Sequence, residues 1–180
     1  MVKARKQAPP ARGLRESCRP SVWRSEREAR LYTEVAATVR NAGQSHRGYQ
    51  VGVAAKLRDR DGNDRLVWGA NKKLLEGPRT CKDHCAEEFC ECCVRLFGGK
   101  ILALVVYAIP ERDDVSGREE EVPIPCWYCR TRWRKQIATG TGPVTKSTVI
   151  RCVNADDPSV WQEDRIGDFL KGYANDPVEL

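Results

Sequence analysis

Three cysteines and one glutamate near the middle of the chain have the types and the spacing of a catalytic metal site. Cys85 and Glu87 are two residues apart, and Cys126 and Cys129 follow later as a Cys-x-x-Cys pair. Zinc binds thiolates in a tetrahedral shell, and a catalytic site supplies three protein ligands and leaves the fourth position to water. Cys85, Cys126 and Cys129 are therefore candidate zinc ligands, and Glu87 is a candidate proton carrier beside a zinc-bound water.

Two other readings of these residues have to be weighed. A Cys-x-x-Cys pair is also typical of redox pairs and of structural zinc sites, and a fourth sulfur from another cysteine between 81 and 93 would close the zinc shell. Neither reading explains the glutamate two residues after Cys85 or the proline directly before Cys126. His84 is a further candidate ligand, but its spacing to Glu87 favours a solvent-facing residue at a helix start. The open, catalytic site is the interpretation that the residues favour.

Hydrophobic spacing and capping residues predict the elements that must hold these side chains. Helices are expected at 25–42, 84–97, 126–138 and 164–172, and strands at 49–57, 65–70, 100–109 and 147–153. The three cysteines then lie at helix N-termini, where the helix dipole favours thiolates. This order of elements predicts an α/β fold, a three-layer α/β/α sandwich with a central mixed sheet.

The same patterns predict which side chains face the core. In the helix at 84–97 the expected apolar side is formed by Phe89, Cys93, Leu96 and Phe97, and the expected polar side by Glu87, Glu88, Glu91 and Arg95. Residues 111–121 are acidic and are expected to form a surface loop. Residues 130–135 are basic around Trp133, and we expect an amphipathic helix with this tryptophan buried and the arginines solvated.

Length and charge indicate one enzyme domain with a basic leading segment. Of the 180 residues, 25–180 are expected to form the domain, and 1–24 to form a flexible N-terminal segment. Residues 1–30 have a net charge of +6, which is the net charge of the whole chain, so the rest is neutral. No apolar run approaches the roughly 20 residues of a membrane span, and no secretory signal is evident. A cytoplasmic location is therefore expected, where the nine cysteines would be thiols and metal ligands.

With these residues in place, the chain resembles the zinc-dependent cytidine deaminase superfamily over residues 25–173. Within it, the nucleoside-type cytidine deaminases and the blasticidin-S deaminases are the most similar. The resemblance rests on the metal motifs. It extends to YQVGVA at 49–54, GAN at 69–71, the Cys-Arg pair at 129–130 and IGDFL at 166–170. It implies one zinc ion per subunit, a soluble homo-oligomer (a dimer or a tetramer) and a nucleoside-type substrate.

The resemblance also implies roles for individual residues. Tyr49 is expected to line the pocket for the base, although a core aromatic at a strand start is an equally good interpretation. Asn71 is expected to contact the sugar, although it could equally be a turn residue. The residues next to the metal ligands, namely Ala86, Pro125 and Trp127, are expected to border the substrate.

Three departures from the family pattern concern the substrate. Lys73 stands where the nucleoside deaminases have a glutamate that binds a sugar hydroxyl, and a lysine cannot accept a hydrogen bond but can meet a phosphate or carboxylate. Glu88 replaces the arginine that offsets the thiolate charge. Trp127 and Tyr128 replace small residues between the second pair of cysteines. These changes leave the expected reaction intact and argue against unmodified cytidine as the substrate.

Three functional hypotheses follow from these residues. The first is hydrolytic deamination of a cytosine ring in a small molecule: cytidine, deoxycytidine, a nucleotide or a nucleoside analogue. The second is a single-stranded DNA or RNA cytosine deaminase, for which residues 1–30 and 130–135 are the candidate nucleic-acid contacts. The third is a non-catalytic binding module of the deaminase type, which the presence of Glu87 makes the weakest of the three.

Overall fold

The computed structural model describes residues 22–44, 48–72, 84–111, 113, 115, 117 and 119–176. Its helices are α1 (Glu26–Arg40), α2 (Ala86–Phe97), α3 (Trp127–Thr139), the short α4 (Ile166–Phe169) and a 3₁₀ turn, η1 (Leu170–Tyr173). Its strands are β1 (Val51–Arg58), β2 (Asp64–Ala70), β3 (Lys100–Ala108), β4 (Val149–Asn154) and β5 (Trp161–Arg165). The first helix, the first four strands and the two cysteine-bearing helices lie within a few residues of their predicted positions.

The five strands form one mixed sheet in the order β2-β1-β3-β4-β5. β1 pairs antiparallel with both β2 and β3, β3 pairs parallel with β4, and β4 pairs antiparallel with β5. The apolar strand β3 is central, as its composition predicted. The parallel pair β3–β4 requires a crossover, and α3 lies on that crossover.

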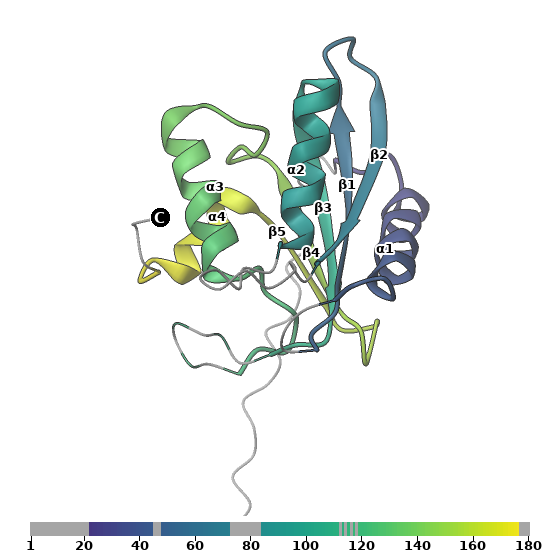
Figure 1. Cartoon of the computed structure of the whole chain (residues 1–180), viewed down its shortest axis with the longest axis vertical. Coiled ribbons are helices and arrows are strands. Elements are labelled where there is room, and N and C mark those ends of the chain that lie inside the picture. The colour runs from purple at the N-terminus through teal and green to yellow at the C-terminus, as the bar shows by residue number, and fades with distance from the viewer. Residues whose placement is uncertain are drawn as a thin grey trace, which may run out of the picture.

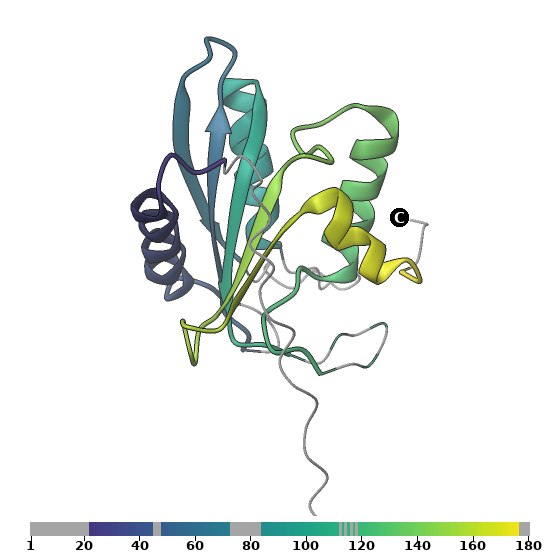
Figure 2. The same ribbon diagram turned by 180° about the vertical axis from the view of Figure 1, so that it is seen from behind.

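Helices cover both faces of the sheet (Figure 1; Figure 2 gives the view from behind). α1 covers one face, where Ala36 and Tyr32 pack with Ala54 and Val105. α2, α3 and α4 cover the other face and enclose the larger core, which includes Trp133, Leu104, Ile150 and Ile166. The predicted three-layer α/β/α sandwich is confirmed.

A close approach between α2 and strand β2 fixes the distance of this cysteine-bearing helix from the sheet. A methyl group added at Gly69 of β2 would lie 2.5 Å from Phe89 Cβ and 2.9 Å from the carbonyl oxygen of Ala86. The absence of a side chain at Gly69 therefore lets the first turn of α2 lie directly on the sheet. That turn is the one that begins at Cys85.

The predicted helix at 164–172 is wrong at its start. Residues 161–165 form the strand β5, which pairs with β4, and the helical part begins only at Ile166. The segment WQEDR is polar because β5 is an edge strand, with every side chain exposed or half-buried. Its sequence lacks the apolar alternation by which strands are recognised, so only its pairing to β4 identifies it.

The predicted faces of α2 are wrong in part: Phe89 and Cys93 are half-buried and Arg95 is exposed, but four other residues lie on the opposite side from the one expected. Its buried residues are Ala86, Glu87, Cys90, Glu91 and Val94, whereas Leu96 and Phe97 are exposed. Two glutamates expected on the polar side thus face the interior. For Glu91 the reason is that Arg132, Trp133 and Gln136 supply its partners in the interior, and hydrophobic spacing carries no information about such partners.

Two segments expected at the surface contribute to the packed body. Asp113, in the acidic segment 111–121, is buried, although its described neighbours Val115 and Gly117 are exposed. Trp23, placed by sequence in the flexible N-terminal segment, is buried against α1, and its Nε1 donates to Glu163. Residues 1–21 lie outside the described part of the chain. None of the described helices has both the length and the apolar character that crossing a membrane requires.

Candidate metal centre

The N-termini of α2 and α3 bring the sulfurs of Cys85, Cys126 and Cys129 together. All three sulfur atoms lie within 4.8 Å of one another, and Cys85 Sγ is 3.4 Å from Cys126 Sγ. Two thiolates on one tetrahedral zinc, at about 2.3 Å each, lie about 3.8 Å apart. The three sulfurs therefore have the spacing of ligands to one zinc ion, and the Cys85–Cys126 pair, at 3.4 Å, is not a disulfide.

Local structure at the start of α2 explains the position of Cys85. Cys85 is the N-cap of the helix, and its backbone N–H donates to Glu88 Oε2 at 3.2 Å in a capping box. Just before it, His84 and Lys72 pair through both backbone hydrogen bonds, which joins this turn to the end of β2. His84 itself is exposed, as predicted. Glu88 thus serves as a cap where the family pattern has an arginine.

The turn before α3 places the other two sulfurs. Cys126 directly follows the buried Pro125 and is the N-cap of α3. Cys129 lies in the first turn of the helix. Proline favours such a helix start because its φ angle is already suitable. Cys126 is exposed and Cys129 is buried. One side of the cluster therefore opens to solvent, and this is the side from which a water or substrate could approach.

The three thiols influence one another's ionisation. Hydrogen bonds from the Cys129 and Cys85 side chains hold the pKa of Cys126 well below its usual range. The same contacts with Cys126 raise the pKa of Cys85 and of Cys129. One sulfur is thereby favoured as a thiolate, and ionisation of all three at this separation requires a cation between them.

Glu87 lies at the second position of α2 and is 4% exposed. Burial raises the pKa of the Glu87 carboxyl to about 8, and the charge of the nearby Cys126 acts in the same direction. A cation held by the sulfurs would act in the opposite direction and favour the carboxylate. Burial and a bound cation thus act on the pKa of Glu87 in opposite directions, and a general acid and base needs a carboxyl that can both bind and release a proton.

The donor set fits a zinc ion with one open position. Among the residues that the structure describes, the only cluster of three or more metal-ligating side chains is Cys85, Cys126 and Cys129. Cys90 is buried and its Sγ faces the Val53 carbonyl oxygen, while Cys92 is exposed. Cys81 lies outside the described residues. No described fourth sulfur therefore joins the three, as a catalytic site requires.

A polar network that sequence analysis missed joins α2 to α3 beside the sulfurs. Glu91 accepts hydrogen bonds from Trp133 Nε1 at 3.0 Å and Gln136 Nε2 at 2.7 Å, and pairs with Arg132 Nη2 at 2.6 Å. Arg132 also pairs with Glu88 through Nη1. Spacing gives a signal that could have found Glu91, because it follows Glu87 by four residues and so shares its helix face.

The basic run at 130–135 is occupied by internal contacts. Trp133 is fully buried, as predicted, but the prediction that the arginines are solvated is wrong. Arg130 is fully buried between Asp113 and Asp176, Arg132 pairs with the α2 glutamates, and Arg134 pairs with Asp176 at 2.9 Å. Arginines held in this way are not free to contact phosphates.

Three of the residues predicted to border the substrate are sequence neighbours of the cysteines, and Tyr49 interacts electrostatically with Glu87. Ala86 is fully buried in the first turn of α2, and Pro125 and Trp127 flank Cys126, with Trp127 half-buried. Tyr49 precedes β1, its hydroxyl donates to the Ile109 carbonyl at 2.7 Å, and it lies near enough to Glu87 for the two charges to interact. Lys73 lies outside the described residues.

Asn71 has the role of a turn residue. Its Oδ1 accepts from the backbone N–H of Val51 at 2.8 Å, and its Nδ2 donates to the carbonyl of Tyr49 at 2.8 Å. Asn71 is also 5% exposed. The amide thus joins the end of β2 to the start of β1, and a contact to a sugar stays a prediction that would have to use its second N–H.

Comparison with known proteins identifies the fold. No family model matches the chain, and no curated protein matches its sequence. Among solved structures, the crystal structure of cytidine deaminase from Burkholderia pseudomallei aligns over 77% of this chain and 93% of its own, with a TM-score of 0.55 and 17% identity. Cytidine deaminase from Mycobacterium tuberculosis covers 79% and 93% (TM-score 0.48, 24% identity), and that from Mycobacterium leprae 79% and 96% (0.47, 21%).

The first of these alignments shows that the chain has a cytidine deaminase fold. At 17% identity this likeness concerns the fold alone, and the activity has to be argued from the residues of the site.

Proposed function

We propose that this protein is a zinc-dependent hydrolytic deaminase that converts a cytosine ring to uracil in a small molecule and releases ammonia. The observation that carries the proposal is the convergence of three sulfurs and one buried glutamate at two helix N-termini. Three thiolates with an exposed side form an open site, and a carboxylate beside it can move protons. The cytidine deaminase fold of the chain agrees with this chemistry.

The proposed reaction divides into a metal role and a protein role. A zinc ion held by Cys85, Cys126 and Cys129 would supply a polarised water as the nucleophile for the amine-bearing carbon. Glu87 would take a proton from that water and deliver protons to the ring nitrogen and to the leaving amine. The carbon–nitrogen bond to the amine breaks and a carbonyl oxygen replaces it, so water and the aminated ring give uracil and ammonia.

The remaining residues of the site would bind and orient the base. Tyr49, Ala86, Pro125 and Trp127 are the proposed contacts to the ring, because they lie beside the cysteines or within the electrostatic reach of Glu87. Lys73 remains a proposed contact to a phosphate or carboxylate, since a lysine cannot accept a hydrogen bond from the sugar hydroxyl. A nucleotide or an acidic nucleoside analogue therefore belongs with cytidine among the candidate substrates.

A small molecule is favoured over a polynucleotide by the state of the basic run. Arg130, Arg132 and Arg134 are engaged in ion pairs and Trp133 is buried, so the three arginines are not free to bind phosphates and the tryptophan offers no stacking surface. Only Lys135 of the described run 130–135 is exposed. The basic residues at 24–30 lie on or just before α1, which covers the sheet face opposite to the cysteines (Figure 1). A cytoplasmic, homo-oligomeric enzyme remains part of the proposal.

The test is a substrate screen with purified, zinc-loaded protein. Cytidine, deoxycytidine, their monophosphates, nucleoside antibiotics and single-stranded oligonucleotides are compared for ammonia release and for the one-dalton gain of deamination. We expect turnover on at least one small molecule. Turnover on oligonucleotides alone would contradict the proposed substrate class, and no turnover on any compound would leave a binding module as the better interpretation.

A glutamate variant tests the catalytic assignment separately. Glu87→Gln should retain zinc and lower kcat by about 10²- to 10⁴-fold, the usual contribution of general acid–base catalysis. The matched control is Glu34→Gln on the exposed side of α1, which should leave both zinc content and kcat unchanged. Undiminished kcat in Glu87→Gln would remove Glu87 from the mechanism.

A further inference from the structure

Arg130, directly after the candidate ligand Cys129, is at the centre of a buried network. Its side chain is fully buried, and Nε and Nη2 bind the two oxygens of Asp176 at 2.7 Å each. Nη2 also donates to Asp113 Oδ1 at 3.0 Å, and the guanidinium lies over the Tyr173 ring at 4.4 Å. A fork of this kind fixes direction as well as charge, because both carboxylate oxygens are engaged in one plane.

The fourth contact of this guanidinium reaches the metal centre. Arg130 Nη1 donates to the carbonyl oxygen of Pro125 at 2.7 Å, and Pro125 is the residue before Cys126. The peptide that follows this carbonyl carries the exposed ligand of the cluster. A buried cation therefore holds the turn at which Cys126 enters α3.

The two carboxylates come from segments that contribute no ligand. Asp113 belongs to the acidic segment 111–121, and Asp176 follows η1 near the end of the described chain. Arg134 adds a second cation to Asp176 and also donates to the carbonyls of Leu170 and Tyr173. The segment after α4 is thus bound to α3 by the same charges that hold the Pro125 turn.

We infer that Arg130 is a positioning residue for the metal centre, which makes zinc affinity depend on Asp176 and Asp113. The inference rests on the metal centre of the proposed function and not on its substrate. A metal site loses affinity when the groups that orient its ligands are removed, even where those groups never touch the metal. Here the orienting group acts on the backbone beside Cys126, and the C-terminal segment holds the orienting group in place.

The test measures zinc binding in the full-length chain, independently of catalysis. Arg130→Lys retains the charge but loses the fork, and Asp176→Asn retains the shape but loses the ion pair. We expect zinc affinity, measured by competition with a chromophoric chelator, to fall about 10- to 100-fold in both variants. The absorption bands of the cobalt-substituted site should shift in the same variants, because the geometry of the Cys126 ligand changes.

A milder variant guards against loss of folding. Asp113→Asn removes the charge of a single partner and leaves both Asp176 contacts intact, so it should fold and show a smaller loss of zinc affinity in the same direction. The matched control is Lys56→Met, which removes another buried and paired cation, on the opposite face of the sheet. It should lower the Tm and leave zinc affinity and the cobalt spectrum unchanged.

The outcomes separate this inference from the proposed function. Unchanged zinc affinity in all three variants of the Arg130 network would overturn the inference alone. A loss that Lys56→Met reproduces at an equal drop in Tm would overturn it as well, because Arg130 would then act only through global stability. Failure of the unmodified chain to bind zinc through the three thiolates would overturn the metal centre and the inference together.

Discussion

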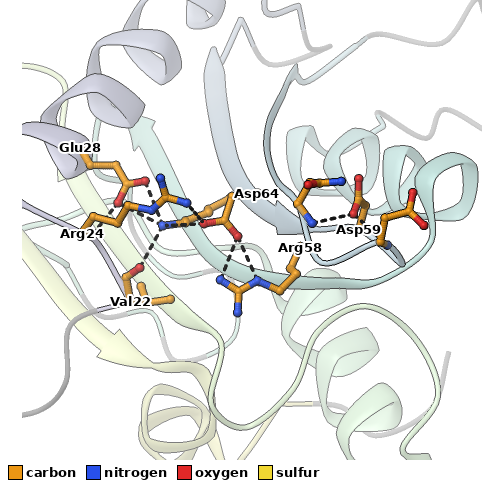
Figure 3. A network of polar contacts seen from close by, with 9 residues as sticks. Val22, Arg24, Glu28, Arg58, Asp59 and Asp64 are labelled. Atoms are coloured by element: carbon orange, nitrogen blue, oxygen red, sulfur yellow. Dashed lines mark hydrogen bonds and ion pairs between the residues drawn. The ribbon is translucent and has the colours of Figure 1, made fainter.

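Two buried cations, Lys56 and Arg130, lie on opposite faces of the same sheet and have the same kinds of partner. Lys56 Nζ pairs with Glu28 at 2.9 Å and with Asp64 at 3.4 Å, and it donates to the carbonyl of Val22. These three partners of Lys56 are labelled in Figure 3. Arg130 likewise has two carboxylates and one carbonyl. Each network joins a helix to segments that are distant in the sequence.

The difference lies in what each network holds. Lys56 joins the start of α1 to β1 and β2, and every residue it touches belongs to the scaffold. Arg130 holds the carbonyl next to Cys126, so its contacts end at a candidate metal ligand. Burial of a charge therefore does not identify a functional residue by itself, and the group to which the charge is bound decides its role.

The largest effect that would sharpen this comparison is expected for Lys56→Met. It removes the buried cation that pairs with both Glu28 and Asp64, and of the two carboxylates Asp64 keeps Arg24 and Arg58. Breaking a buried ion pair from one side costs about 3 to 5 kcal/mol, so the free energy of unfolding should fall by that amount in urea titrations. Lys135→Met, at an exposed position of α3, is the matched control and should change stability by less than about 0.5 kcal/mol. An equal effect of the two substitutions would contradict the role of Lys56.

A second prediction concerns Glu91, which joins the two helices that zinc would also join. Glu91→Gln loses the ion pair with Arg132 and the acceptor for Gln136, and should cost about 2 to 3 kcal/mol. Because zinc and Glu91 connect the same helices, their contributions should not be additive.

Thermal unfolding with and without a strong chelator checks this coupling. The chelator should lower the Tm of the native chain, and the drop caused by Glu91→Gln should be larger in the metal-free protein. Melting curves that the chelator leaves unchanged would show that zinc does not join α2 to α3.

The third prediction uses acid to test the α1 face. Burial alone would raise the pKa of Asp64, but its ion pairs with Arg58 and Lys56 outweigh burial and leave it below its usual value. A carboxyl with a lowered pKa in the folded state stabilises the protein above its unfolded pKa of about 4, and this stability is lost as the pH falls further.

Asp64→Asn should therefore cost about 1 to 2 kcal/mol at pH 7, since its cations keep other partners. The unfolding free energies of the variant and the native chain should converge as the pH falls from about 5 to 3. A difference that stays constant over this range would show that the charge of Asp64 is not the source of its effect.

The sequence was sufficient for the parts of the molecule governed by local rules. The cysteine spacing and the proline before Cys126 placed the candidate ligands at helix starts, and hydrophobic spacing placed α1 and the central strand. The structure follows these predictions because capping and periodic burial depend on neighbours within a few residues.

What the sequence could not predict depends on partners far along the chain. Arg130 and Asp176 are 46 residues apart, and the pairing of Glu91 with Trp133 spans 42. Charged residues are mostly exposed unless they are paired, and the sequence does not show which residue is the partner. Hydrophobic spacing therefore predicts Glu91 and Arg130 at the surface, although both are buried. The strand β5 was missed for the same reason, since a polar edge strand is defined by the neighbour with which it pairs.

The smallest predicted effect compares the second cation of each network. Arg24 is 74% exposed and contacts Asp64 at 2.9 Å, so Arg24→Ala should cost less than about 1 kcal/mol. Arg134 is 26% exposed and binds Asp176 together with two backbone carbonyls, so Arg134→Ala should cost more, about 1 to 2 kcal/mol.

Urea unfolding at pH 7 measures both costs, and raised salt should reduce only the Arg24 effect, because exposed pairs are screened. If the two substitutions were equal in size and in salt dependence, the network around Arg130 would be no better protected from solvent than the one around Lys56. The C-terminal segment would then be too loosely held to position the turn at Cys126.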